Sequence, residues 1–281
     1  MRAPIDVFLR VTPEEVLVSD PVKIVVLGAG GRMGQEIIEA ARRDEDVCVH
    51  GVVELPGHKI IGQRPSPDLP ALEVVSDLRA ALVGADVLVD FTRPESTLGA
   101  LEVAVDAGVA AVVGTTGLSS DQRYQLAEFA EEIPLVFSPN MSVGINVMMW
   151  LLRIATEALG EDYDVEVFEM HHRHKKDAPS GTALRLAEVL CEARGLDVKQ
   201  TLSYGRKGDA QRTDAEIGMQ VLRGGDVAGE HTVYFLGEGE RLEVTHRASS
   251  RHVFAQGALR AAKWVKERRP GLYSMDEVLG L

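Results

Sequence analysis

The feature that most constrains the fold is an apolar run followed by a glycine-rich turn and an apolar helical stripe. The run, Val22–Leu27, is rich in β-branched residues and almost continuous, which is typical of a strand buried on both faces of a parallel sheet. It ends in the glycine-rich residues 28–34, after which the apolar residues in 37–41 follow helical spacing. A strand, a glycine turn and a helix in this order predict a dinucleotide-binding unit.

The glycine turn departs from the ideal GxGxxG pattern. Its sixth position is Met33, and the third glycine, Gly34, comes one residue later. A second apolar segment, Val47–Val53, ends at Glu54, which lies 20 residues after Gly34. A carboxylate at this spacing can accept hydrogen bonds from the adenosine ribose hydroxyls. Glu54 therefore strengthens the dinucleotide prediction.

The alternation of strand and helix continues to residue 138. Strands are expected at 73–75, 85–91, 110–114 and 134–138, and helices at 78–83, 94–107 and 119–131. Such repetition predicts a Rossmann-type α/β fold, a doubly wound parallel sheet with right-handed crossovers. Ligands of these sheets bind beyond the carboxyl ends of the strands. The residues there, 91–94, 114–117 and 138–141, are small, polar or turn-forming; each set fits ordinary turn chemistry, but three in succession favour a cofactor site.

After residue 142 the pattern changes. A long apolar helix, Val143–Leu159, precedes a strand at 165–170, a helix at 182–193 and antiparallel-looking strands at 217–223, 230–236 and 241–246. A final helix at 254–268 is expected to return to the first domain. We therefore expect a second α+β domain with a mixed or antiparallel sheet. The predicted division is an extension (1–21), a dinucleotide-binding domain (22–142 and 252–281) and a substrate-binding domain (143–251).

A basic stretch lies at the start of this second domain. Six consecutive residues, 171–176, are basic or can become so, in a chain of formal net charge −13. They lead into Ser180, a good helix N-cap, and the amides of Ser180, Gly181 and Thr182 have no intrahelical partner. Together with the positive end of the helix dipole, these groups predict a site for a small anion. A solvated basic loop is the alternative interpretation.

A nicotinamide-type fold combined with an anion site suggests hydride transfer to a small anionic substrate. A carboxylate near an imidazole favours the charged imidazolium, which suits a general acid at neutral pH. A metal site is not expected, because His171 and His172 point to opposite faces of a strand and the neighbouring Arg and Lys repel a cation.

Composition bears on partners and compartment. The acidic balance, with a pI of about 5.1, argues against a nucleic-acid partner. Cys48 and Cys191 show no paired spacing, residues 1–21 lack the marks of a targeting peptide, and no apolar run approaches the length of a membrane span. We expect a soluble cytoplasmic protein with no membrane partner.

Seven motifs, spread from about residue 22 to the C-terminus, resemble those of the bacterial 4-hydroxy-tetrahydrodipicolinate reductases, also called dihydrodipicolinate reductases. The motifs are GAGGRMG at 28–34, DFTRPE at 90–95, VGTTG at 113–117, NMSVGINV at 140–147, EMHHRHK at 169–175, DAPSGTA at 177–183 and GEHT at 229–232. The run of basic residues followed by Pro-Ser-Gly-Thr is highly specific for this family.

The resemblance implies roles for individual residues. His171 matches the proton donor and Lys175 the second catalytic residue. The implied substrate contacts are His172, Lys175, Ser180, Gly181 and Thr182. The implied cofactor contacts are Gly28, Ala29, Gly30, Gly31, Arg32, Met33, Glu54, Phe91, Thr92, Gly114, Thr115, Thr116, Ser138, Pro139, Asn140 and Met141.

The resemblance also implies the reaction, reduction of a cyclic dicarboxylate by NAD(P)H in lysine biosynthesis, and a homotetramer assembled through the second domain. Two departures from the family pattern are Leu55, where dual-cofactor members carry Arg, and Met141, where many carry Phe. Because Glu54 repels a 2′-phosphate and Leu55 offers it no partner, NADH is expected to be favoured. NADPH stays possible through Lys59 or Arg64.

Two other classes of function fit the same residues. A different NAD-dependent dehydrogenase acting on another small carboxylate predicts no activity with the product of dihydrodipicolinate synthase. A non-catalytic NADH-sensing regulator predicts cofactor binding without turnover and leaves His171 and Lys175 without a purpose.

Overall fold

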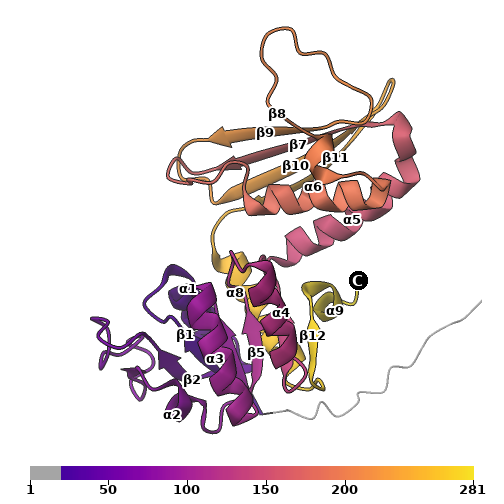
Figure 1. Cartoon of the computed structure of the whole chain (residues 1–281). Coiled ribbons are helices and arrows are strands. Elements are labelled where there is room, and N and C mark those ends of the chain that lie inside the picture. Colours follow the sequence, from indigo (N-terminus) through magenta and orange to yellow (C-terminus); the bar gives the residue numbers. More distant parts are fainter. Residues whose placement is uncertain (1–19) are drawn as a thin grey trace, which may run out of the picture.

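The structure, a computed structural model, describes residues 20–281, and nearly all of the expected extension (1–21) lies outside this range. The chain forms two units, each built on one sheet (Figure 1). The strands of the first sheet are β1 (Val22–Leu27), β2 (Val47–Val53), β3 (Val74–Val75), β4 (Val87–Asp90), β5 (Ala110–Val113), β6 (Pro134–Phe137) and β12 (Gly271–Tyr273). Their order is β12-β6-β5-β4-β1-β2-β3, and all neighbouring strands are parallel.

Helices cover both faces of this first sheet. They are α1 (Arg32–Arg42), α2 (Leu78–Leu82), α3 (Pro94–Ala107), α4 (Ser120–Phe129) and α8 (His252–Val265). Helices α1 and α8 share one buried cluster with Ile24 and Val26 of β1, while α2, α3 and α4 share the other with Val25. Strand β1 is thus buried on both faces, as its continuous apolar run predicted, and the doubly wound parallel fold is confirmed.

The second sheet is mixed. Its strands are β7 (Asp164–His171), β8 (Leu202–Tyr204), β9 (Ile217–Arg223), β10 (Gly229–Leu236) and β11 (Arg241–Ala248), in the order β11-β10-β7-β9-β8. The expected α+β unit with a mixed or antiparallel sheet is confirmed as a mixed sheet: β9, which looked antiparallel in the sequence, runs parallel to both β7 and β8. The reason is the helical crossover after β7, which returns the chain to the end of the sheet where β7 began.

Two long helices, α5 (Val143–Leu159) and α6 (Gly181–Arg194), cover one face of this sheet (Figure 1). Ile145, Met148 and Leu152 of α5 pack with α6 in the buried cluster of this unit. Within residues 20–281, the stretch Val143–Asp162 is also long and apolar enough to cross a membrane by length and composition alone.

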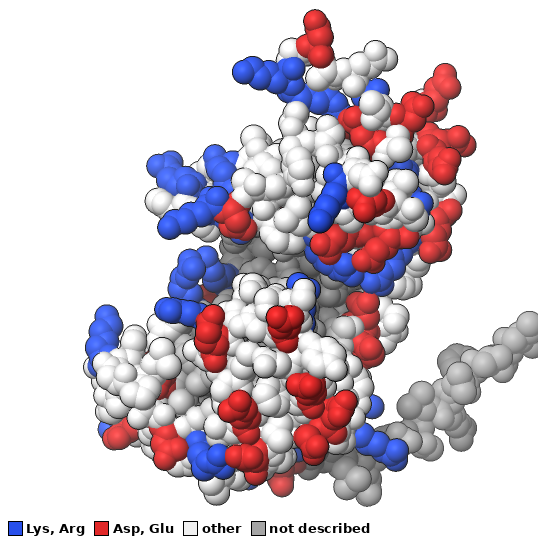
Figure 2. Space-filling view, in the orientation of Figure 1, with Lys and Arg blue, Asp and Glu red and all other residues white. Residues whose placement is uncertain are grey.

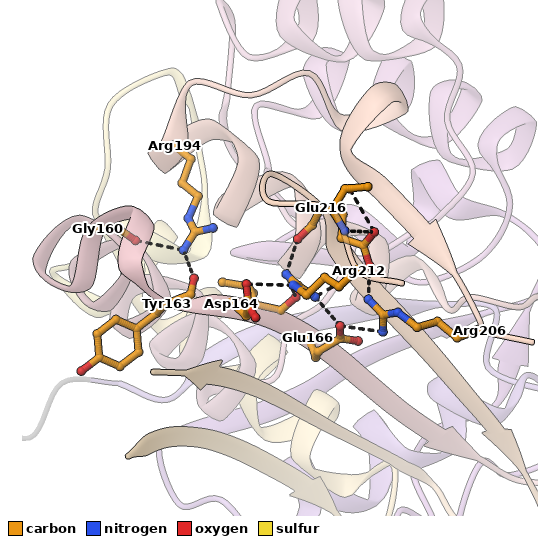
Figure 3. A network of polar contacts seen from close by, with 10 residues as sticks. Gly160, Tyr163, Asp164, Glu166, Arg194, Arg206, Arg212 and Glu216 are labelled. Atoms are coloured by element: carbon orange, nitrogen blue, oxygen red, sulfur yellow. Dashed lines mark hydrogen bonds and ion pairs between the residues drawn. The ribbon is translucent and has the colours of Figure 1, made fainter. Parts of the chain in front are cut away.

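The opposite face of the second sheet carries a network of ion pairs (Figure 3). Arg206 and Arg212, from the segment between β8 and β9, both bind Glu166 of β7 and Glu216. Arg194 at the end of α6 donates to the carbonyl oxygens of Gly160 and Tyr163. The ion pairs of Arg206 and Arg212 with Glu166 hold the segment between β8 and β9 against the sheet.

The chain passes between the two units twice, after β6 and after β11. Short elements complete the fold: a 3-10 turn (Gly160–Asp162), α7 (Val198–Thr201) and α9 (Met275–Leu279). The side chain of Ser142 caps α5, and Arg251 stands at the N-cap of α8. Helix α8 then packs on α1 and on the first sheet, so the end of the chain returns to the first unit as expected.

Candidate active site

A cleft of about 680 Å³ lies between the two units. Its walls come from the segments that follow β5 and β6, from α5 and α9, and from the stretch that joins β7 to α6. The residues named by the sequence that line it are Thr115, Thr116, Ser138, Pro139, Asn140, His171, Lys175, Ser180, Gly181 and Thr182. The structure therefore brings the anion-site residues and part of the predicted cofactor edge to one cavity.

Four cationic and three acidic side chains line this cleft, and acidic side chains are spread over the visible faces of both units (Figure 2). The cationic side chains that line it are Arg123, Arg153, Lys175 and Arg185. Within the described residues no group of three or more His, Cys, Asp or Glu side chains is arranged to hold a metal. Lys175, Arg153 and Arg185 pair with carboxylates of the same cleft, Asp177, Asp276 and Glu188, so the excess of positive charge there is small.

The glycine turn after β1 has the shape that a dinucleotide needs. Gly28 has a left-handed φ of +76°, and a Cβ on Gly34 would lie 2.2 Å from the carbonyl oxygen of Gly28. Helix α1 has no side-chain cap and no acidic residue in its first turn. Its N-terminal amides therefore remain available to a pyrophosphate, and a nicotinamide dinucleotide fits here.

Glu54 is buried at the end of β2 and points back at this turn. Its carboxylate accepts from the amide of Gly30 at 2.9 Å and from the amide of Leu55 at 2.9 Å. Leu55 itself is 58% exposed. The sequence spacing predicted the position of Glu54, but not that backbone amides fix its orientation.

The other predicted cofactor residues lie along the same edge of the parallel sheet, although they do not line the cleft itself. They are Gly28, Ala29, Gly30, Gly31, Arg32, Met33, Glu54, Phe91, Thr92, Gly114 and Met141. Phe91 lies against Gly114, where a Cβ would be 2.1 Å from the ring. The side chain of Met141 is 1% exposed and belongs to the core beneath α8.

The anion site forms where β7 ends and α6 begins. Ser180 caps α6, its Oγ accepting from the amide of Ala183 at 3.1 Å, as its sequence position predicted. The Oγ1 of Thr182 accepts from Nδ2 of Asn140, at 3.0 Å across the cleft. Lys175 reaches Asp177 at 2.9 Å. The first turn of α6 and one ammonium group thus face the same space.

His172, a predicted substrate contact, does not line the cleft. It follows the last residue of β7, and its ring centroid lies 6.3 Å from that of His174. Loss of solvation and the positive charge of Arg251 lower the pKa of His172. In this conformation the structure separates it from His171, as the alternation of side chains along a strand implies.

His171 is held by groups that the sequence did not single out. Its Nδ1 lies 2.6 Å from Oε2 of Glu169, which is fully buried and also binds Arg223 and the amide of Ser180. One signal was present, because residues two apart on a strand share a face, and Glu169 and His171 have this spacing.

His231 of β10 lies beside His171, with ring centroids 5.2 Å apart in an edge-to-face arrangement. Burial, followed by the charge of His171, lowers the pKa of His231 to about 3, so its ring is neutral at physiological pH. Nε2 of His231 lies 3.2 Å from Oγ of Ser180. The site therefore holds one histidine that can carry charge beside one that does not.

Two sheets that meet at a cleft, with a dinucleotide turn on one side and an acid and an anion site on the other, define a two-domain pyridine-nucleotide oxidoreductase. Sequence models for the N-terminus and C-terminus of dihydrodipicolinate reductase match residues 22–141 and 144–279. The chain belongs to this family. The predicted activity class, an NAD(P)H-dependent 4-hydroxy-tetrahydrodipicolinate reductase, is confirmed at that level.

Individual relatives agree with this assignment. The 4-hydroxy-tetrahydrodipicolinate reductases of Thiobacillus denitrificans and Citrifermentans bemidjiense are 48% and 50% identical, over 92% of this chain and 99% of theirs. A dipicolinate-bound dihydrodipicolinate reductase from Paenisporosarcina sp. TG-14 has a similar structure, with a TM-score of 0.74 and 25% identity over 92% of this chain and 98% of its own.

Proposed function

We propose that the protein reduces 4-hydroxy-2,3,4,5-tetrahydrodipicolinate to 2,3,4,5-tetrahydrodipicolinate in the cytoplasm, in the diaminopimelate route to lysine. The observation that carries this proposal is the convergence of His171, Lys175 and the first turn of α6 on the cleft beyond β5 and β6. A dicarboxylate is the substrate class that such a cleft favours, because carboxylates bind both ammonium groups and helix N-termini.

The reaction divides between the cofactor and the chain. Gly28–Met33 and Glu54 would hold the pyrophosphate and ribose of NAD(P)H, which would supply the hydride when bound. The amides of Gly181 and Thr182, the Thr182 hydroxyl and the Lys175 ammonium bind the substrate carboxylates. His171, held through Nδ1 by Glu169, donates a proton from Nε2 to the substrate.

The test is NADH oxidation in the presence of the freshly generated product of dihydrodipicolinate synthase. We expect rapid, substrate-dependent loss of absorbance at the NADH band. Turnover only with another carboxylate would favour a different dehydrogenase. NADH binding in a fluorescence titration without turnover on any carboxylate would favour the regulator.

NADH is proposed as the favoured cofactor. The carboxylate of Glu54 is fixed by two amides and lies where the ribose hydroxyls bind, so it repels the 2′-phosphate of NADPH. Leu55 provides no compensating guanidinium. Lys59 and Arg64 are exposed in the following loop and stay available to a phosphate.

A homotetramer assembled through the second sheet is also proposed. One face of this sheet packs on α5 and α6, and the other carries Leu222 of β9 and Leu236 of β10, 50% and 36% exposed. Exposed apolar side chains on the part of this face that the segment between β8 and β9 does not cover favour contact with another copy. Light scattering on the eluted protein tests this, because a single-subunit mass contradicts it.

The proposed domain division keeps the boundaries expected from the sequence. Residues 22–142 and 252–281 bind the nucleotide, and residues 143–251 bind the substrate. The boundaries coincide with the caps at Ser142 and Arg251, where α5 and α8 begin.

A further inference from the structure

Glu169 is a fully buried carboxylate that receives four hydrogen bonds. Its Oε2 lies 2.6 Å from Nδ1 of His171 and accepts from Nη1 of Arg223 at 2.8 Å. Its Oε1 accepts from Nη2 of Arg223 at 2.8 Å and from the amide of Ser180 at 2.9 Å. Burial by itself raises the pKa of Glu169, but the bonds from His171, Arg223 and Ser180 outweigh it and hold the pKa at about 2. The carboxylate is therefore ionised throughout the physiological range.

The ionised carboxylate of Glu169 beside Nδ1 determines which ring nitrogen of His171 faces the cleft. Because Glu169 has no proton to give, Nδ1 must carry one, so the ring presents Nε2 to the cleft. The negative charge also stabilises the imidazolium, which is the form that donates a proton. Gly229 leaves room on this side, since a Cβ there would lie 3.0 Å from Nε2.

Arg223 connects this carboxylate to the anion site. The same Nη2 that binds Glu169 donates to the carbonyl oxygen of Asp177 at 2.6 Å, and Nη1 donates to the carbonyl oxygen of Leu222 at 2.7 Å. Asp177 is the partner of Lys175, and Ser180 opens α6. One guanidinium–carboxylate pair thus touches the proton donor and both ends of the segment 177–180.

We infer that Glu169 and Arg223 are positioning residues, which fix the tautomer and orientation of His171 and hold the segment 177–180 against the end of β7. The inference rests on the proposed role of His171 as proton donor. Neither residue lines the cleft; both act through His171 and through the helix cap.

The test is the pH dependence of kcat and kcat/KM in Glu169→Gln. A glutamine keeps the shape but offers one oxygen to four donors, so its amide group opposes Arg223 whichever way it turns. We expect kcat to fall on the order of 10²-fold, because most of the general-acid contribution is lost. The loss of activity at high pH should begin at a lower pH than in the wild type.

Glu166→Gln is the matched control. Glu166 lies on the same strand, points to the opposite face and is also paired with arginine side chains, Arg206 and Arg212 instead of the single Arg223. Its pH profile should equal that of the wild type. An equal displacement of the profile in Glu166→Gln would refute a specific role for Glu169, and so would a wild-type profile in Glu169→Gln.

A double variant separates this inference from the proposed function. If His171 is the proton donor, adding Glu169→Gln to His171→Ala should cause no further loss of kcat at saturating substrate, and the loosened segment 177–180 should appear only as a higher KM. If His171→Ala alone keeps near-normal kcat, the proposed role of His171 as proton donor is refuted, whatever Glu169 does. A full additional loss in the double variant would show that Glu169 acts independently of His171 and would overturn the inference alone.

Two further measurements keep the inference testable if Glu169→Gln does not fold. Arg223→Lys keeps the charge but loses the two-pronged contact, and it should reproduce part of the change in the pH profile. In the wild-type enzyme, ¹⁵N shifts of the His171 ring, assigned by comparison with His171→Ala, should show the neutral ring protonated at Nδ1. Protonation at Nε2 in the neutral ring would overturn the inference without any change to Glu169.

Discussion

Replacing Gly257 by alanine should destabilise the first unit through one contact. Gly257 lies in α8, whose neighbouring residues Ala255 and Ala258 are fully buried, and a Cβ there would be 1.7 Å from the carbonyl oxygen of Met141. Because this atom belongs to the backbone, relief requires α8 or the segment before Ser142 to move by at least about an ångström. Overpacking of this kind costs about 3 kcal/mol, the upper part of the usual range.

Alanine also favours helix over glycine by about 0.5–1 kcal/mol, so the net loss should be about 2 kcal/mol. That corresponds to a melting temperature lower by roughly 4–8 °C in thermal unfolding of the ligand-free protein. Gly99→Ala is the control, because Gly99 is exposed in α3 and a Cβ there meets nothing within 4 Å. It should raise the melting temperature slightly. Equal melting temperatures for the two variants would refute the steric reasoning.

Three further outcomes follow from the site. His171→Ala should lose kcat by roughly 10²–10⁴-fold, whereas Lys175→Ala should lower kcat and raise KM together, both at saturating NADH. Leu55→Arg should raise the ratio of kcat/KM with NADPH to that with NADH, and a wild type that already prefers NADPH contradicts the assignment. Burial lowers the pKa of His231 from 6.5 to about 3 in the folded protein. As the pH falls, the His231 ring of the unfolded chain therefore binds a proton before that of the folded protein does. The stability present above pH 6.5 is lost as the pH falls toward 3. Between pH 7.5 and 5 the free energy of unfolding, measured with urea, should fall by about 2 kcal/mol for this reason, and His231→Gln should remove this contribution.

The parts of the fold that the sequence predicted are those with strong local patterns. Strand β1 and the turn after it combine a continuous apolar run with glycines that the backbone requires, so their structure follows from neighbouring residues. Strands β8 and β12 have three residues each and were missed, because their pairing with β9 and β6 supplies what their own sequence lacks. The direction of β9 depends on the path of the crossover after β7, and no local sequence pattern indicates that path.

The site divides in the same way. Ser180, Gly181 and Thr182 were predictable because a helix N-terminus exposes its amides wherever such a motif opens a helix. The partnership of Glu169 and Arg223 was not, since 54 residues separate them and only the parallel pairing of β7 with β9 places them together. Local sequence therefore identified the groups that are proposed to bind the ligand, and tertiary pairing decides how they are oriented.

A hydrogen bond between Asn140 and Thr182 joins the two halves of the site. Asn140 follows β6 of the first unit, and its orientation is set because Oδ1 accepts from the amide of Ser142 at 2.9 Å. Its Nδ2 must then donate, and it donates to Oγ1 of Thr182 at the start of α6. A hydroxyl that accepts from an amide keeps its own proton free for a carboxylate. The contact from Asn140 therefore leaves the Thr182 hydroxyl proton available for the substrate carboxylate that we propose it binds.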